Sequence, residues 1–246
     1  VCEIEESVRS TKDMSENELE SFKILHWLIY FCWNIGIFKP LLKYANIELN
    51  INPMDVLLHV LETKKNKLRE LFSSMKNEST SEWFGTKKDL IAYYEDARNR
   101  NKLKEFKKLN AWWIAKLYSD NDLLNILYDD IVLCIENHSV KKYSNDVVWD
   151  ELKNINSKLL SFGDLSKSEQ SPIISVHGKT IYYLNGDSRY VDKLNMKIYI
   201  NRDNESAQWW DYYLDGESYS DVPINQFLSA LEKGGSSRLL NSVVVQ

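Results

Sequence analysis

Three side chains of metal-binding types lie four residues apart: Asp130, Cys134 and His138. On a helix this spacing places side chains along one edge, so a carboxylate, a thiol and an imidazole would point the same way. Further ligands are missing nearby, because the other cysteines are Cys2 and Cys32. A buried cysteine with polar neighbours near a helix end accounts for the same pattern. We therefore predict no metal site here.

The remaining histidines are isolated from other chemically active residues. His26 and His59 lie within apolar stretches, where a core histidine with a satisfied ring is the commoner arrangement, and His177 stands alone. The sequence also lacks G-x-S-x-G, the P-loop and G-x-G-x-x-G, which are strong signatures of enzymes. We predict no catalytic and no cofactor-binding residue in this chain.

A strand-like segment near the C-terminus combines acids with aromatic side chains. Trp209, Asp211 and Tyr213 would share one face of a strand, while Trp210 would lie on the opposite, more apolar face. The first three residues are therefore a candidate contact surface. Carboxylate pairs beside aromatic rings could also serve a glycosidase, but such pairs arise by chance among 36 acidic residues. A final helix expected at 224–233 could instead cover this face.

The segment 98–108 is strongly basic. Six of its eleven residues are Lys or Arg: Arg98, Arg100, Lys102, Lys104, Lys107 and Lys108. The segment could contact phosphates or an acidic protein surface, but a solvated helix face around Leu103 and Phe106 produces the same pattern. The net charge of -5 argues against a surface built for nucleic acid.

The composition is that of a helix-rich globular protein. Hydrophobic residues make up 43% of the 246 residues, and 8 Gly and 4 Pro are few for this length. Three widely spaced cysteines form no disulfide framework, so we expect a reducing, cytoplasmic environment. The chain begins with Val1 and an acidic stretch, which predicts a fragment without a signal peptide. The apolar run 24–38 is shorter than the roughly 20 residues of a membrane span.

Capping signals predict where the elements that carry these residues begin. Ser15 with Glu18 forms a capping box. The inward stripe expected for the helix that follows is Leu19, Phe22, His26, Ile29 and Trp33. Asn52 and Pro53 open a further helix expected to reach Phe72.

Loop composition then predicts a connection at 73–81, and Thr86 with Asp89 predicts the cap of a helix from about Lys87. In the next helix Trp113 is expected to face inward, with Trp112 turned away from the core.

Residues 162–172 form a polar loop that we take as the boundary between a helical domain, 1–161, and a small α+β part, 173–246. In the second part, two apolar segments flank His177 and Gly178 and predict a hairpin, and 196–200 alternates as a strand. The predicted fold is therefore α+β and mostly α, with a bundle-like N-terminal part followed by a small antiparallel sheet and a C-terminal helix.

Two segments resemble the region that follows the radical SAM barrel in cobalamin-binding-domain radical SAM proteins. They are VRSTKDMSENELESFKILHWLIYFCWNIGIFKPLLKYA and SEWFGTKKDLIAYYEDARNRNKLKEFKKLNAWWIAKLY, within roughly the first 135 residues. The resemblance implies that the parent protein binds S-adenosylmethionine, a [4Fe-4S] cluster and cobalamin, and performs radical chemistry. The family's CxxxCxxC and D-x-H-x-x-G loops have no counterpart in this chain. No cofactor and no catalytic residue transfers to it.

Three functions remain open. The first is a non-catalytic accessory domain that packs on the radical SAM barrel of the same parent and helps to close its substrate site. The second is a free-standing helical module that binds a protein or nucleic-acid partner through 98–108. The third is a carbohydrate-active hydrolase built on the strand that contains Trp209. We expect the first, with the barrel as partner and neither membrane nor nucleic acid involved.

Anaerobic reconstitution with iron and sulfide should load no stoichiometric iron–sulfur cluster on the chain, and added cobalamin should not bind, because both ligand motifs are missing. Visible absorbance measures both. Cluster absorbance that disappears when Cys32 and Cys134 are replaced would contradict this expectation.

Overall fold

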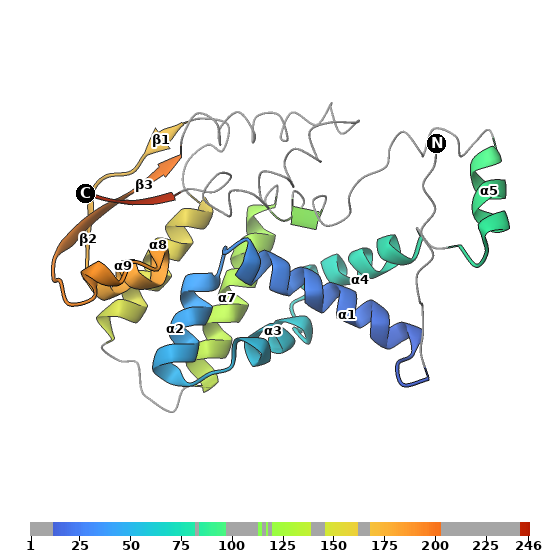
Figure 1. Ribbon diagram of the computed structural model, residues 1–246, viewed down its shortest axis with the longest axis horizontal. Coiled ribbons are helices and arrows are strands. Elements are labelled where there is room, and N and C mark those ends of the chain that lie inside the picture. Colours follow the sequence, from blue (N-terminus) through green and yellow to red (C-terminus); the bar gives the residue numbers. More distant parts are fainter. Residues whose placement is uncertain are drawn as a thin grey trace.

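The computed structural model describes residues 12–81, 84–96, 113–114, 117, 120–138, 146–161, 168–202 and 242–246. Most of these residues are helical, and a small antiparallel sheet lies at one end of the molecule (Figure 1). The predicted mostly α, α+β fold class is confirmed. The C-terminal helix expected at 224–233 lies outside the described residues.

Helix α1 (Glu16–Ile29) begins as predicted. Ser15 and Glu18 form the full capping box, in which the Glu18 backbone N–H donates to the Ser15 hydroxyl and the Glu18 carboxylate accepts from the Ser15 backbone. The predicted inward stripe is wrong for Phe22, which is 53% exposed, and for His26, whereas Ile29 and Trp33 pack against the main core as predicted. The side chains that face the core are instead Ile24, Trp27, Leu28 and Phe31. Both stripes have helical spacing and apolar residues, so spacing alone could not choose between them.

The chain turns sharply after α1. A π-helical turn, η1 (Tyr30–Asn34), follows the helix, and Gly36 then adopts a φ of 95°. Helix α2 (Lys39–Leu49) leaves at 87° to the α1–η1 axis. No single helix among the described residues is long and apolar enough to cross a membrane, although this bent pair together meets the same length and composition test.

Helix α3 (Pro53–Leu61) starts at the predicted cap, where the Asn52 side chain accepts from the Met54 backbone N–H. The expected continuous helix to Phe72 is wrong, because the chain breaks after Leu61 and α4 (Asn66–Ser81) begins anew. The loop predicted at 73–81 is also wrong. Burial of Met75 extends α4 through this polar segment, since packing outweighs weak helix propensity.

Helices α1, α4, α7 (Asn121–His138) and α8 (Val147–Ser161) enclose the main core together with α2 and α3 (Figure 1). Trp113 is buried, as predicted, and its ring lies edge-on to Trp27 at 6.3 Å between centroids. The Trp113 indole N–H donates to Glu78 over 2.9 Å. The first tryptophan of the pair, Trp112, lies outside the described residues.

The predicted core histidines are exposed. His26 lies on the outer side of α1, and His59 lies on α3 beside the buried positions Val56 and Val60. On each helix the apolar residues next to the histidine in sequence face the core, whereas the histidine itself points outward. Helix α5 (Lys87–Glu95), capped by Thr86 as predicted, has no buried residue and stands apart from the bundle (Figure 1).

The sheet is centred on β3 (Met196–Arg202), whose predicted alternation is confirmed by the buried side chains of Ile198 and Ile200. On one side, β3 pairs with β1 (Glu169–Gln170) and β2 (Ile174–Val176), and on the other with β4 (Ser242–Val245), all antiparallel. Between β1 and β2 the edge bulges. There the Ser171 hydroxyl accepts from the Ile200 backbone N–H over 2.9 Å.

The hairpin predicted around His177 and Gly178 is wrong. Helix α9 (Gly178–Asn185) follows β2 directly, so KTIYYL is helical. Two features outside this segment select the helix. The Glu151 carboxylate of α8 accepts from the His177 backbone N–H over 2.9 Å, and Tyr183 is buried in the main core. A short run of β-formers was therefore overridden by tertiary contacts.

Side chains of the predicted helical domain and of the predicted α+β part pack together across the boundary between them. Ile155 of α8 belongs to the small core under the sheet, whereas Tyr183 of α9 belongs to the main helical core. Strand β1 falls inside the segment 162–172 that was expected to be a loop. The short 3-10 turn η3 (Ser188–Tyr190) then leads from α9 to β3.

Gly178→Ala should destabilise the fold by more than about 3 kcal/mol, because an added Cβ would lie 1.6 Å from the Tyr190 backbone carbonyl oxygen. Urea unfolding measures the change. Gly85→Ala is the matched control, since its Cβ would meet only Asp89 Oδ2 at 3.6 Å. Equal stability of both variants would show that the turn after α9 does not pack as described.

Candidate functional site

The residues that the sequence analysis selected as a contact surface lie outside the described part of the chain. They are Arg98, Arg100, Lys102, Lys104, Trp209, Asp211 and Tyr213. The structure therefore leaves their arrangement untested, and candidate sites must be sought among the other elements.

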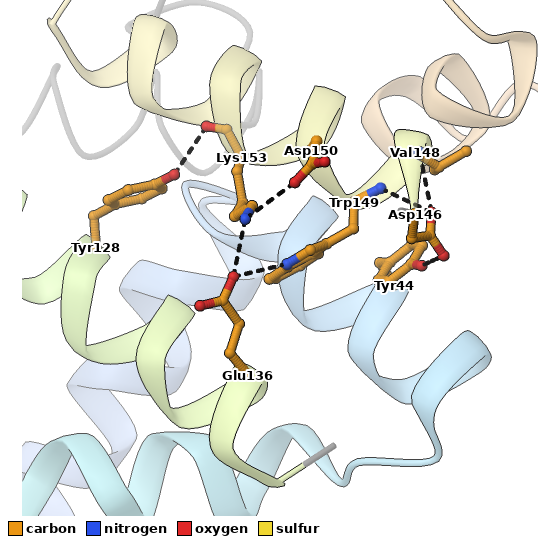
Figure 2. A network of polar contacts seen from close by, with 8 residues as sticks. All are labelled: Tyr44, Tyr128, Glu136, Asp146, Val148, Trp149, Asp150 and Lys153. Atoms are coloured by element: carbon orange, nitrogen blue, oxygen red, sulfur yellow. Dashed lines mark hydrogen bonds and ion pairs between the residues drawn. The ribbon is translucent and has the colours of Figure 1, made fainter. Parts of the chain in front are cut away.

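A polar cluster joins α7 to α8 (Figure 2). Glu136 Oε1 accepts from Lys153 Nζ over 2.9 Å and from the Trp149 indole N–H over 3.1 Å. Lys153 Nζ also lies 3.2 Å from the Asp150 carboxylate. Burial acts to raise the pKa of Glu136, but these hydrogen bonds and the Lys153 charge leave that pKa below its usual value. The carboxylate is thus held in its charged form.

Tyr128 adds a further link between the same two helices. Its hydroxyl donates to the Lys153 backbone carbonyl over 2.9 Å (Figure 2). Burial, with the negative charges of Asp129 and Glu136, raises the pKa of Tyr128 to about 12. The phenol therefore stays neutral and acts as a hydrogen-bond donor rather than as a base.

The start of α8 is fixed by Asp146. Its Oδ1 accepts from the backbone N–H groups of Val148 and Trp149 over 3.1 and 3.2 Å, and its Oδ2 accepts from the Tyr44 hydroxyl (Figure 2). The Tyr44 ring stacks on Trp149, with 5.3 Å between centroids. A single carboxylate thereby caps α8 and ties it to α2.

Tyr183 and Glu48 make a similar link between α9 and α2. The Tyr183 hydroxyl donates to Glu48, and Lys179 Nζ lies 2.9 Å from the same carboxylate oxygen. Burial and the Glu48 charge raise the pKa of Tyr183. Beside this link, Lys43 Nζ lies 3.8 Å from the centre of the Tyr182 ring, within the range of a cation–π contact.

The pair Glu151 and His177 has the geometry of a proton-transfer pair, with 2.7 Å between Glu151 Oε1 and His177 Nδ1. The same carboxylate also accepts from the Thr180 hydroxyl and from the His177 backbone N–H. Its oxygens are therefore occupied in capping α9 from α8. We interpret this pair as a structural cap rather than as a base awaiting a substrate.

These clusters share one chemical property, which is that their charged and phenolic groups are engaged with a neighbouring helix. Within the described ranges, no group of three or more His, Cys, Asp or Glu side chains is placed to hold a metal ion. Sequence analysis missed the clusters because their partners lie 13 to 29 positions apart on separate helices, or further, and leave no periodic signal.

The outer side of α1 is a different kind of candidate. It carries the stripe that sequence analysis had assigned to the core, which we call the α1 outer stripe: Leu19, Phe22, His26, Ile29 and Trp33. Phe22 is 53% exposed, His26 is exposed, and the other three side chains are half-buried, with Ile29 and Trp33 packed against the main core. The exposed end of this stripe, around Phe22, is suited to contact with another protein surface.

A hollow of about 550 Å³ opens beside the bulged edge of the sheet. Ile173, Ile174 and Ile200 give it apolar walls, and Lys158 lies at its rim on α8. No buried charged group lies among its lining residues, so it offers little to select a ligand beyond apolar surface.

Comparisons with protein-family models, with curated proteins and with solved structures found no match for this chain.

A double-mutant cycle with Glu136→Gln and Lys153→Met should give a coupling free energy of about 1 kcal/mol, because both side chains are only about a third exposed and share Trp149. The exposed pair Lys67 and Asp122, joined over 2.8 Å, is the matched control and should give a smaller coupling, because water screens both charges. Equal couplings would contradict a structural role for the buried cluster.

Proposed function

We propose that this chain is a non-catalytic accessory domain of a radical SAM enzyme, and that it packs on the barrel of that enzyme through the α1 outer stripe. The observation that carries the proposal is the exposure of Phe22 and His26 in this stripe, on a helix whose opposite side forms the main core. A position of this kind lets the domain border a substrate site without supplying reactive groups.

The use of the polar groups supports a non-catalytic role. Glu136, Glu151 and Asp146 each accept two or more hydrogen bonds from neighbouring helices or caps. A catalytic carboxylate needs an oxygen that can reach a substrate, whereas these oxygens hold the bundle together.

The location of the stripe supports the choice of partner. All five of its residues fall within the first segment that resembles the region following a radical SAM barrel. Phe22 exposes more than half of its surface, and aromatic side chains are enriched at the centres of protein–protein interfaces.

The two cysteines that the structure describes do not fit an iron–sulfur cluster. Cys32 and Cys134 are free and buried on different elements. Burial raises the pKa of Cys134 to about 11 and raises that of Cys32 as well, so both remain neutral thiols. Clusters bind thiolates, and we therefore assign the [4Fe-4S] cluster, S-adenosylmethionine and cobalamin to other domains of the parent. Buried free thiols also support our placement of the protein in the reducing cytoplasm.

The reading frame that encodes this chain tests the proposal directly. We expect a CxxxCxxC motif upstream of Val1 in the same frame. A start codon immediately before Val1 would overturn the proposal, because no barrel would then be joined to this domain.

Phe22→Asp should weaken binding between the chain and the separately expressed barrel by about tenfold or more, because it places a charge in the centre of the proposed interface. Pull-down or calorimetry measures the affinity. Ile47→Asp on α2 is the matched control, since Ile47 is 51% exposed but lies on a different helix from Phe22. Equal loss in both variants, or none in either, would contradict docking through α1.

A further inference from the structure

Two exposed histidines from different helices meet at the junction of α3 and α7. The rings of His59 and His138 have centroids 6.2 Å apart and are inclined at 78°. They are 79 positions apart in the sequence, so no local pattern relates them. The spacing along α7 relates His138 to Asp130 and Cys134 instead.

The structure explains why those two are not partners of His138 in a site. Cys134 is 1% exposed, and the buried carboxylate of Asp130 accepts from the Thr63 hydroxyl. Both groups therefore point into the helix junction, while the imidazole of His138 reaches its surface.

A hydrogen bond decides which nitrogen of His138 can bind a metal. Its Nδ1 lies 2.8 Å from the Cys134 backbone carbonyl oxygen, which can only accept, so Nδ1 carries the proton. In the neutral ring, Nε2 then has its lone pair free. This is the arrangement by which proteins orient metal-binding histidines, with one ring nitrogen anchored and the other directed to the ion.

The distance between the two ring centres is close to that expected when both imidazoles bind the same metal ion. Metal–nitrogen bonds of roughly 2.0–2.1 Å at a tetrahedral angle place two ring centres about 5 Å apart. The observed 6.2 Å requires an approach of about 1 Å, which side-chain rotation of the exposed His59 can supply.

The charge around the junction favours a cation. Asp55 lies one helical turn before His59 on α3, and Asp130 lies eight residues before His138 on α7. Besides burial, both carboxylates act to raise the pKa of the Cys134 thiol, which adjoins His138. Lysine and arginine are absent from the four positions on either side of His59.

We propose that His59 and His138 form a two-imidazole binding site for a divalent transition-metal ion of the Zn²⁺, Ni²⁺ or Cu²⁺ class. Water completes the coordination, and the Asp55 carboxylate lies on the same face of α3 as His59. With two protein ligands, the site binds more weakly than structural zinc sites, which have four. A bound ion would clamp α3 to α7, and Cu²⁺ would bind most tightly of the three.

Cu²⁺ titration of the untagged chain, followed by electron paramagnetic resonance, tests the proposal. A tag-free protein is essential, because a histidine tag binds the same ions. We expect one Cu²⁺ per chain, with nitrogen coupling from two imidazoles. His59→Ala and His138→Ala should each remove one coupled nitrogen and weaken binding by about tenfold or more. His26→Ala is the matched control, since His26 is also exposed on a helix, and should change neither property.

Thermal unfolding provides an independent readout. Zn²⁺ should raise the midpoint of the wild-type chain and of His26→Ala, because an ion that binds only the folded state stabilises it, and should leave the other two variants unshifted. Circular dichroism without metal identifies any variant that fails to fold, and His138→Gln then replaces His138→Ala. Unchanged Cu²⁺ spectra in the His59 and His138 variants, or a wild-type spectrum with one coupled nitrogen, would overturn the proposal.

Discussion

A buried carboxamide joins α8 to the turn between the first two helices, α1 and α2. Asn156 Nδ2 on α8 donates to the Ile37 backbone carbonyl over 2.8 Å, within the turn that follows η1. Asn156 is fully buried, and its Oδ1 has no hydrogen-bond partner among the residues that the structure describes. Without this donor the Ile37 carbonyl would lose its partner in an apolar interior, which costs more than an average hydrogen bond contributes. The contact therefore stabilises the turn that η1 and Gly36 make.

The position of α8 determines the surrounding polar contacts. From one helix, Trp149 stacks on α2, Lys153 pairs with α7, and Glu151 caps α9. Ile155 meanwhile packs under the sheet. Successive faces of α8 thus serve different neighbours, which is why the helical part and the sheet share packing instead of meeting across a simple linker.

Local signals in the sequence were sufficient for the starts of helices, and distant contacts decided the rest. The caps at Ser15, Asn52 and Thr86 were predictable because the capping atoms lie within three residues of their partners. The helical state of 178–185 depends instead on Glu151, 26 positions before His177, and could not be read from the segment itself. The polar clusters of α8 escaped prediction for the same reason. The side of α1 that faces the core could not be predicted, because both sides of the helix are apolar between Ile24 and Trp33.

The bulge between β1 and β2 has a consequence for self-association. At Ser171 a hydroxyl takes the place of a backbone carbonyl in the ladder with Ile200, and Pro172 then presents no N–H to the outside. A strand from another molecule that approached this edge would find its row of donors and acceptors interrupted after two residues. The Ser171 hydroxyl thus keeps the Ile200 N–H of β3 hydrogen-bonded. The same replacement of a backbone acceptor by a side chain makes this side of the sheet a poor template for cross-β growth.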